Sequence, residues 1–296
     1  MKVYPLMKYK YWFIGVLGAV TIFALSAIFV VGLQLGIDFQ GGVRAEIKLT
    51  QSTTADRVRE AFFSAGVKDP IVQASANNVF VVTAQEMADE QFEGGLANLK
   101  DLGAEESAVG LERVGPSFGR DTANRALLAI GISILVMVAY IAWRFDIKFS
   151  LPAMASIVHD VGLTLGIYAI SGRLVTTATV AATLTILGYS INDTIIVFDR
   201  IRENQAYMKN ETYSDMADRS IRQVIARSIN TPVTTLLPLL AILLFGGETL
   251  KDFAFALFIG IAVGTYSSIF VAAPLLVLWK EREPKYRKRL AATKGA

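Results

Sequence analysis

One aspartate inside a long apolar segment is the residue of this sequence best suited to chemistry. Asp193 lies in the run Gly188–Thr194, about one and a half helical turns before the charged pair Asp199-Arg200. An ionisable side chain at membrane depth costs several kcal/mol unless it faces a partner or a wet cavity. Desolvation favours the neutral form of a carboxyl group and a nearby cation favours the charged form, so such a group can bind and release a proton.

Arg227 is the cation that we expect to approach Asp193. Both residues lie towards the same end of their apolar segments, and an arginine stem is long enough to reach inward. Three interpretations stay open: a proton relay, a static ion pair that orients two helices, or an arginine that only anchors at the lipid headgroups. Tyr189 and Asn192 are accessory candidates, because they lie within about one turn of Asp193.

His159 and Asp160 form a second candidate site near the middle of the third apolar segment. A histidine can titrate near neutrality, which suits a proton path. The alternative is a hydrogen-bonded pair that locks this helix to a neighbour. The sequence leaves both interpretations open.

The composition excludes most enzymatic and cofactor chemistry. The chain has no cysteine and one histidine, so it lacks the clustered ligands of a zinc site. It contains neither the phosphate-binding sequence G-x-x-x-x-G-K-[ST] nor the nucleophile sequence G-x-S-x-G. We therefore predict no enzyme activity, no cofactor and no metal, and the protein needs another energy source for any work.

Six apolar segments reach or approach the length of about 20 residues that crosses a bilayer. Hydrophobic residues make up 53% of the chain, which is too apolar for an ordinary soluble domain. The predicted membrane helices run over Tyr11–Leu33, Ala126–Trp143, Leu151–Ile170, Val175–Phe198, Thr231–Phe245 and Phe253–Trp279. The fifth is short, and we expect it to extend at its N-terminal end.

Positive charge predicts the orientation, because cytoplasmic segments carry an excess of Lys and Arg. Basic residues gather in the N-terminus, in the predicted loop 199–230 and in the tail, whereas the two short opposite loops carry only Arg173 and Lys251. Both termini are therefore expected in the cytoplasm, with the first helix as a retained anchor. The predicted division is 1–35 for the N-terminus and first helix, 36–120 for an exported domain, 121–280 for five further helices and 281–296 for the basic tail.

The segment 36–120 has the composition and patterning of a soluble domain. Apolar residues alternate as in strands over 43–49, 70–74, 79–83 and 108–114, and they recur at helical spacing over 53–65 and 86–102. The order β-α-β-β-α-β predicts a ferredoxin-like α+β sandwich. The expected fold class is thus a polytopic α-helical membrane protein with one extracytoplasmic α+β domain between helices 1 and 2.

Three passages resemble the SecD/SecF family of protein-export membrane proteins, within the resistance-nodulation-division superfamily. Residues 36–42, GIDFQGG, resemble its Gly-Asp-Phe-x-Gly-Gly signature at Gly36, Asp38, Gly41 and Gly42. Residues 188–204, GYSINDTIIVFDRIREN, resemble the fourth-helix signature of its SecF members. RSINTPVTTLL from residue 227 and GTYSSIFVAAP from residue 264 resemble the signatures of the fifth and sixth helices.

The resemblance implies a SecF-type subunit that pairs with SecD beside the SecYEG channel in the bacterial inner membrane. Such complexes are held to use the proton motive force to promote preprotein translocation on the outer side. Asp193 and Arg227 match the proton-pathway residues of the family, and Gly36 to Gly42 would be a hinge between the first helix and the exported domain. The resemblance gives His159 and Asp160 no role.

Two other functions stay open. The chain could be half of an exporter of lipids or small molecules from the same superfamily, or a scaffold that transduces no energy and only stabilises a partner. The scaffold hypothesis predicts that the ionisable membrane residues are dispensable. Six helices, against twelve in the superfamily, imply a partner for either transporting protein.

Overall fold

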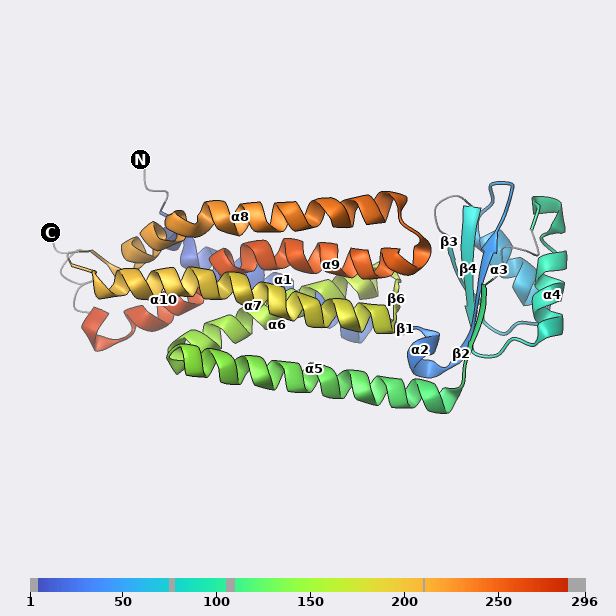
Figure 1. The fold of residues 1–296 in the computed structure, drawn as a ribbon, viewed down its shortest axis with the longest axis horizontal. Coiled ribbons are helices and arrows are strands. Elements are labelled where there is room, and N and C mark those ends of the chain that lie inside the picture. The colour runs from blue at the N-terminus through green and yellow to red at the C-terminus, as the bar shows by residue number, and fades with distance from the viewer. Residues whose placement is uncertain (1–4, 75–77, 105–109, 210, 287–296) are drawn as a thin grey trace. The chain divides into compact units, whose positions relative to one another are not determined.

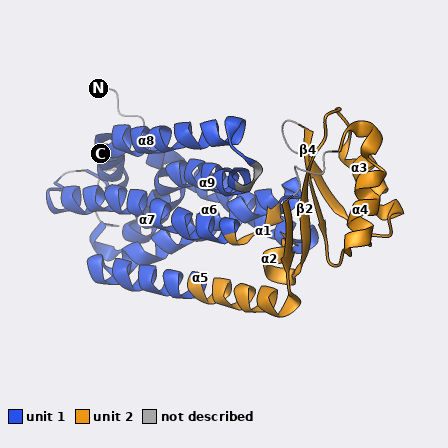
Figure 2. Ribbon diagram, turned by 45° about the vertical axis from the view of Figure 1, so that its right-hand side comes forward, with its two compact units in different colours: residues 1–33, 130–173, 178–296 blue, residues 34–129, 174–177 orange. Residues whose placement is uncertain are grey.

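The computed structural model describes residues 5–74, 78–104, 110–209 and 211–286. The chain divides into two compact units (Figure 2). Unit 1 comprises residues 1–33, 130–173 and 178–296, and unit 2 comprises residues 34–129 and 174–177. The predicted tail lies outside the described residues from position 287 onward.

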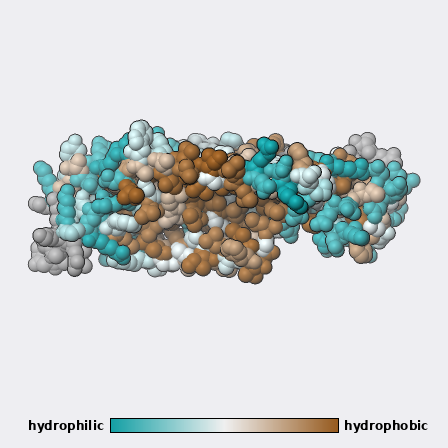
Figure 3. All heavy atoms as spheres, turned by 90° about the horizontal axis from the view of Figure 1, so that it is seen from below, coloured by the Kyte–Doolittle hydropathy of each residue, from teal (hydrophilic) through white to brown (hydrophobic). Residues whose placement is uncertain are grey.

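Unit 1 is a bundle of long helices. Its elements are η1 (Leu6–Tyr9), α1 (Lys10–Val30), the part of α5 (Pro116–Arg144) after residue 129, α6 (Ile147–Ser171), α7 (Thr177–Ala206), α8 (Tyr213–Phe245), α9 (Glu248–Ser267), the π-helical segment η5 (Ser268–Ala272) and α10 (Ala273–Glu281). Helices α8 and α9 run side by side, and the described ends of the chain lie at one end of the bundle (Figure 1). On the face drawn in Figure 3, apolar side chains cover the middle of the helices, and hydrophilic ones gather at the end with the termini.

The six predicted membrane helices are confirmed. In the described part of the chain, six helical segments are long and apolar enough to span a membrane: Leu6–Val30, Pro116–Arg144, Ile147–Ser171, Thr177–Ala206, Tyr213–Phe245 and Leu250–Glu281. More than half of the α6 span is buried, against 6% of the α5 span. Helix α6 therefore lies in the centre of the bundle, whereas α5 presents its surface outward.

The fifth membrane helix extends much further than its apolar segment. Helix α8 begins at Tyr213, and α7 continues to Ala206. Thr212 caps α8, because its hydroxyl accepts a hydrogen bond of 3.1 Å from the Asp215 N–H. The predicted loop 199–230 is therefore mostly helical, and Arg227 lies about four turns inside α8 instead of before it.

Unit 2 contains the predicted ferredoxin-like domain. Its main elements follow in the order β2 (Gly42–Lys48), α3 (Ala55–Ser64), β3 (Ile71–Ala74), β4 (Val79–Ala84), α4 (Asp89–Ala97), η3 (Lys100–Leu102) and β5 (Gly110–Val114). The four strands form an antiparallel sheet in the order β3-β4-β2-β5. This is the β-α-β-β-α-β arrangement that the periodicity predicted.

One face of this sheet and the two helices enclose an apolar core. Ile47 of β2, Val82 of β4, Phe62 of α3 and Leu99 are fully buried there. A Cβ atom on Gly95 of α4 would lie 2.6 Å from the Phe62 ring. The glycine that weakens α4 as a helix thus allows the two helices to pack closely.

A second, smaller sheet was not predicted. Strand β1 (Gln34–Leu35) pairs in parallel with β6 (Leu174–Val175), and the short helix α2 (Ile37–Gln40) follows β1. This pairing brings residues 174–177 into unit 2, so the unit is larger than the predicted segment 36–120.

Candidate functional site

Asp193 is buried in the helix bundle and has no ion-pair partner among the residues that the structure describes. Its side chain is 6% exposed, and its Oδ2 atom accepts no hydrogen bond from the described residues. The hydroxyls of Ser228 on α8 and Ser268 at the start of η5 lie close to the carboxyl group. Burial without a salt bridge is costly for a charged carboxylate and tolerable for a neutral one.

Arg227 lies within electrostatic range of Asp193, as the sequence predicted, but forms no direct ion pair with it within the described part of the chain. The arginine is exposed on α8, and its neighbour Ser228 is fully buried against α7. A static buried ion pair is therefore not the arrangement in this structure.

The accessory candidates Tyr189 and Asn192 flank Asp193 on different faces of α7. The Tyr189 hydroxyl is buried beside Thr235 of α8. Asn192 is exposed and points away from the bundle. Only Tyr189 thus contributes to the same interior region as Asp193.

His159 and Asp160 are both buried on α6, but they contact different neighbours. The His159 ring lies 2.6 Å from the Thr21 hydroxyl of α1 through Nδ1, and 2.8 Å from the Tyr266 hydroxyl of α9 through Nε2. Asp160 Oδ2 accepts hydrogen bonds from Ser190 of α7 and Ser267 of α9. The two residues therefore do not pair with each other, and each joins α6 to two other helices.

The glycine-rich motif after the first helix is a compact structural element of unit 2. The Gly36 N–H donates to the Val175 carbonyl at 2.8 Å, next to the β1–β6 pairing. Asp38 Oδ2 accepts hydrogen bonds from the Thr177 N–H at 2.7 Å and the Thr177 hydroxyl at 2.8 Å. A carboxylate in this position caps the first turn of α7 and complements its dipole.

The backbone conformation and close backbone contacts explain why Gly41 and Gly42 are both glycine. Gly41 and Gly42 have φ angles of +78° and +135°, which favour glycine. A Cβ atom on Gly41 would lie 2.8 Å from the Pro116 Cα atom, and one on Gly42 would lie 2.5 Å from the Ala84 carbonyl oxygen. Any other residue here would displace the backbone at the start of the sheet domain.

Charged side chains form ion pairs at both ends of the bundle. Asp199 on α7 pairs with Arg144 at 3.2 Å and with Arg202 at 3.1 Å, and Lys10 of α1 pairs with Glu281 of α10. At the other end, Arg173 pairs with Asp252 at 2.6 Å. These side chains have opposite charges beside them, which distinguishes them from Asp160 and Asp193.

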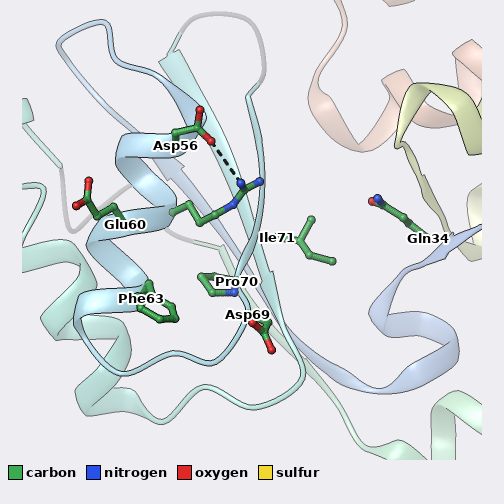
Figure 4. A pocket seen from close by; sticks show the side chains of 8 residues that line it. Gln34, Asp56, Glu60, Phe63, Asp69, Pro70 and Ile71 are labelled. Atoms are coloured by element: carbon green, nitrogen blue, oxygen red, sulfur yellow. Dashed lines mark hydrogen bonds and ion pairs between the residues drawn. The ribbon is translucent and has the colours of Figure 1, made fainter. Parts of the chain in front are cut away.

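Neither unit shows a metal site among the described residues. No cluster of three His, Cys, Asp or Glu side chains occurs there. An open hollow on unit 2 is lined by residues that include Phe63, Ile71 and the ion pair of Arg59 with Asp56 at 3.3 Å (Figure 4). We assign no role to it.

The hydroxyl side chains around the aspartates are what sequence reasoning missed. They are buried, and they come from four segments that lie far apart in the sequence: Ser156, Ser190, Thr194, Ser228, Ser267 and Ser268. Serine and threonine are common in membrane helices, where their hydroxyls also bond to the backbone of the preceding turn. A sequence pattern therefore does not mark them.

Comparison with known families settles the relationship of this fold. Residues 96–282 match the family model described as protein export membrane protein SecD/SecF, C-terminal, and residues 26–53 match the SecD/SecF GG motif. The chain belongs to the SecD/SecF family. Membership makes it a transport-type, multi-pass membrane protein of the bacterial Sec translocase, not an enzyme.

Individual relatives agree with this assignment. The chain is 35% identical to protein translocase subunit SecF of Desulfurispirillum indicum, over 96% of this chain and 95% of that protein. It is 38% identical to protein translocase subunit SecDF of Thermus thermophilus, over 92% of this chain and 37% of that protein. The crystal structure of a Thermus SecDF, described as a translocon-associated membrane protein, superposes with a TM-score of 0.85 at 34% identity, covering 93% of this chain and 38% of that one.

Proposed function

We propose that this protein is a proton-driven subunit which, with a SecD-type partner, promotes preprotein translocation through SecYEG on the outer side of the membrane. The observation that carries the proposal is Asp193, a buried carboxyl group without an ion pair and with Arg227 in electrostatic range. The names of the relatives, SecF and SecDF translocase subunits, support the substrate class and the partner.

The local geometry suggests how a proton does work here. A neutral Asp193 fits its site without a cation. When the proton leaves, the charge attracts the Arg227 guanidinium and the nearby hydroxyls of Ser228 and Ser268. Binding and release of a proton thus alter the packing of α7 against α8 and η5. The free energy of proton binding in this way drives a movement of the helices.

The movement has a route to the GG motif. Helix α7 begins at Thr177, and the N–H and the hydroxyl of Thr177 both donate hydrogen bonds to Asp38 Oδ2. A displacement along α7 would therefore reach the motif from Gly36 to Gly42, from which β2 of the sheet domain starts. This gives the predicted hinge a physical connection to the proton site.

Charge supports an orientation with both termini in the cytoplasm. The bundle end with the termini carries basic side chains on α1, α5, α7 and α10, whereas the other end has Arg173 and Lys251. The Cys-free chain makes this testable with single cysteines at two exposed positions. An impermeant thiol reagent should label Ser52→Cys in intact cells and Ala206→Cys only after the membrane is opened, and the reverse pattern would refute the orientation.

An exposed polar stripe supports a partner in the membrane. Beside exposed apolar residues of α8 such as Ile229 and Val233, one face of α7 and one face of α8 carry exposed residues that are small or polar. They are Ala181, Thr185, Gly188 and Asn192 on α7, and Arg227, Asn230, Thr231 and Thr234 on α8. Small and polar residues at membrane depth are typical of helix contacts and not of lipid contacts. A second helical subunit is the occupant that this face fits.

Asp193→Asn tests the function. The amide keeps the size of the side chain but does not gain or lose a proton near neutral pH, so the response of preprotein translocation to an imposed proton gradient should be lost. The assay uses membrane vesicles that contain the full complex, with ATP held constant and the gradient imposed or collapsed. Asp252→Asn, which changes an ion-paired aspartate at the end of the bundle, is the matched control and should respond normally.

Arg227→Lys should give an intermediate response, because lysine retains the charge but lacks the planar guanidinium group. A full response of Asp193→Asn to the gradient would contradict the proposal and favour the scaffold hypothesis.

A further inference from the structure

A second carboxyl group, Asp160, is more deeply buried than Asp193 and has no part in the proposed function so far. The residue is 0% exposed on α6. Its Oδ2 atom accepts hydrogen bonds from the Ser190 hydroxyl and, at 2.9 Å, from the Ser267 hydroxyl. Its Oδ1 atom is buried and has no hydrogen-bond partner within the described residues. This group is therefore only partly satisfied by its surroundings.

No cation pairs with Asp160 in the described part of the bundle. His159, beside it on α6, directs its two ring nitrogens to Thr21 and Tyr266. Tyr266 of α9 lies in electrostatic range of Asp160. Asp193 lies on α7 about one turn beyond Ser190, and α1 places the Thr21 hydroxyl beside the His159 ring. Arg227 of α8 is exposed. A permanent charge on Asp160 would thus be uncompensated, which proteins avoid by neutralising the group.

Two short connections link Asp160 to Asp193. On α7, Ser190 donates to Asp160 and lies three residues before Asp193, on the same side of the helix. At the end of α9, Ser267 donates to Asp160, and the next residue, Ser268, lies beside Asp193. Ser268 also forms a hydrogen bond of 3.0 Å with Thr194. Each connection therefore links the two carboxyl groups through residues that lie close together in the sequence, one set on α7 and the other at the end of α9.

The second connection lies at an irregular point of the helix. Ser268 begins the π-helical segment η5, and π-helical turns occur frequently at functional sites. The Ser267 hydroxyl has two acceptors, Asp160 Oδ2 at 2.9 Å and the Gly264 carbonyl at 3.3 Å. A Cβ atom on Gly264 would lie 3.4 Å from Ser190 and 3.6 Å from Asp160 Oδ2, so α9 is a direct neighbour of both residues at this point. The hydroxyl can shift between its two acceptors without a large movement.

We infer that Asp160 is a second proton-binding group of this protein, and that its charge is coupled to that of Asp193 through Ser190 on α7 and through Ser267 and Ser268 at the π-helical segment. The inference rests on the proposed function. The step is proton binding alone: one carboxyl O–H bond forms or breaks, and the proton comes from solvent and returns to it. Charged Asp160 holds the Ser190 and Ser267 hydroxyls, and neutral Asp160 releases Ser267 towards Gly264.

Asp160→Asn separates proton binding from a structural role. The amide oxygen still accepts hydrogen bonds from Ser190 and Ser267, so a merely structural Asp160 predicts that this variant is tolerated. Proton binding predicts that the gradient-dependent part of translocation falls at least about tenfold, with insertion and partner recovery unchanged. Asp252→Asn is again the matched control, because it removes a carboxylate from the same bundle.

Infrared spectroscopy tests the inference even where Asp160→Asn disturbs folding. In the reconstituted wild-type complex, a carboxyl C=O band should appear and disappear with pH, and it should be missing in Asp160→Asn. Ser267→Ala removes a hydrogen bond to the same carboxyl group and should move that band to higher frequency. In Asp160→Asn the titration midpoint of the separate Asp193 band should also shift.

The outcomes distinguish this inference from the proposed function. If Asp193→Asn loses the gradient response while Asp160→Asn keeps it, and no band responds to Ser267→Ala, the inference is overturned and the proposed function stands. If both variants keep the response, the proposed function fails as well.

Discussion

The sheet domain and the helix bundle differ in the number and kind of polar side chains that they bury. In the described part of unit 2, Thr83 is the one buried side chain of polar character, and the core of Ile47, Phe62, Phe80 and Val82 is apolar. The bundle buries three aspartates, Asp160, Asp193 and Asp218, together with a histidine and many hydroxyls, and several of these polar atoms lack a partner in the described residues. The Thr83 hydroxyl of the domain also lacks a partner, but among the described residues it is the bundle that buries carboxyl groups with an unpartnered oxygen, and carboxyl groups can exchange protons.

The outer surfaces differ in the same sense. The surface of the sheet domain is mostly hydrophilic on the face drawn in Figure 3, and Phe63 is one of its few strongly exposed apolar side chains. The bundle exposes the polar side chains of Asn192 and Arg227 on helices that are apolar enough to span a membrane, where lipid does not satisfy them. We therefore expect the domain to fold by itself and the bundle to need a second subunit.

The largest effect that we predict concerns the core of the sheet domain. The fragment 42–115 should fold alone, and Phe62→Ala should lower its free energy of unfolding by about 3–5 kcal/mol, because the fully buried ring leaves a cavity. Denaturant unfolding of the two fragments followed by circular dichroism measures this. An unfolded wild-type fragment would show that the domain does not fold alone, which would contradict the difference that we expect between the domain and the bundle.

A second prediction concerns the incomplete face of the bundle. A Cβ atom on Gly188 of α7 meets nothing within 4 Å in this chain, so Gly188→Leu should fold normally. If a partner packs there, the added side chain overpacks the contact and weakens the binding free energy of the partner by about 1–3 kcal/mol. Each 1.4 kcal/mol corresponds to roughly tenfold weaker binding. Co-purification of the second subunit measures the loss.

Gly131→Leu on α5 is the control for this change, because Gly131 is also exposed and also meets nothing within 4 Å. Equal recovery of the partner with both variants would place the interface elsewhere. Loss of partner with Gly188→Leu alone would confirm that the polar stripe is the contact.

The smallest predicted effect is on stability at the proton site. Asp193 makes no ion pair within the described residues, so Asp193→Asn removes no charge pair. It should change the free energy of unfolding by less than about 0.5 kcal/mol, which would appear as a small shift in the thermal midpoint of the detergent-solubilised protein. A large drop in the midpoint would mean that the carboxylate supports the fold.

Much of the fold followed from periodicity. Alternation over 43–49 predicted β2, and apolar length predicted all six membrane helices. The β1–β6 pairing did not follow, because two-residue strands carry no periodic signal. The start of α8 at Tyr213 was also missed, since its first turns are polar and hydropathy marks only the apolar remainder.

The site was predictable where a charge interrupts an apolar run. Asp193 and Asp160 stand out for that reason, and Arg227 was matched with Asp193 by its side of the membrane. The serines around them did not stand out, and neither did the π-helical turn at Ser268, because helical spacing does not encode which hydroxyls meet across four helices. The absence of a direct Arg227–Asp193 ion pair within the described residues likewise depends on tertiary packing.

The most direct measurement is proton movement itself. The full complex is reconstituted in liposomes that contain a pH-sensitive dye, a proton gradient is imposed, and the change in internal pH is followed with and without preprotein. The account predicts a preprotein-dependent proton flux for the wild type and for Asp252→Asn, and none for Asp193→Asn. An undiminished flux with Asp193→Asn would contradict the claim that the buried, unpaired carboxyl group of the bundle couples protons to export.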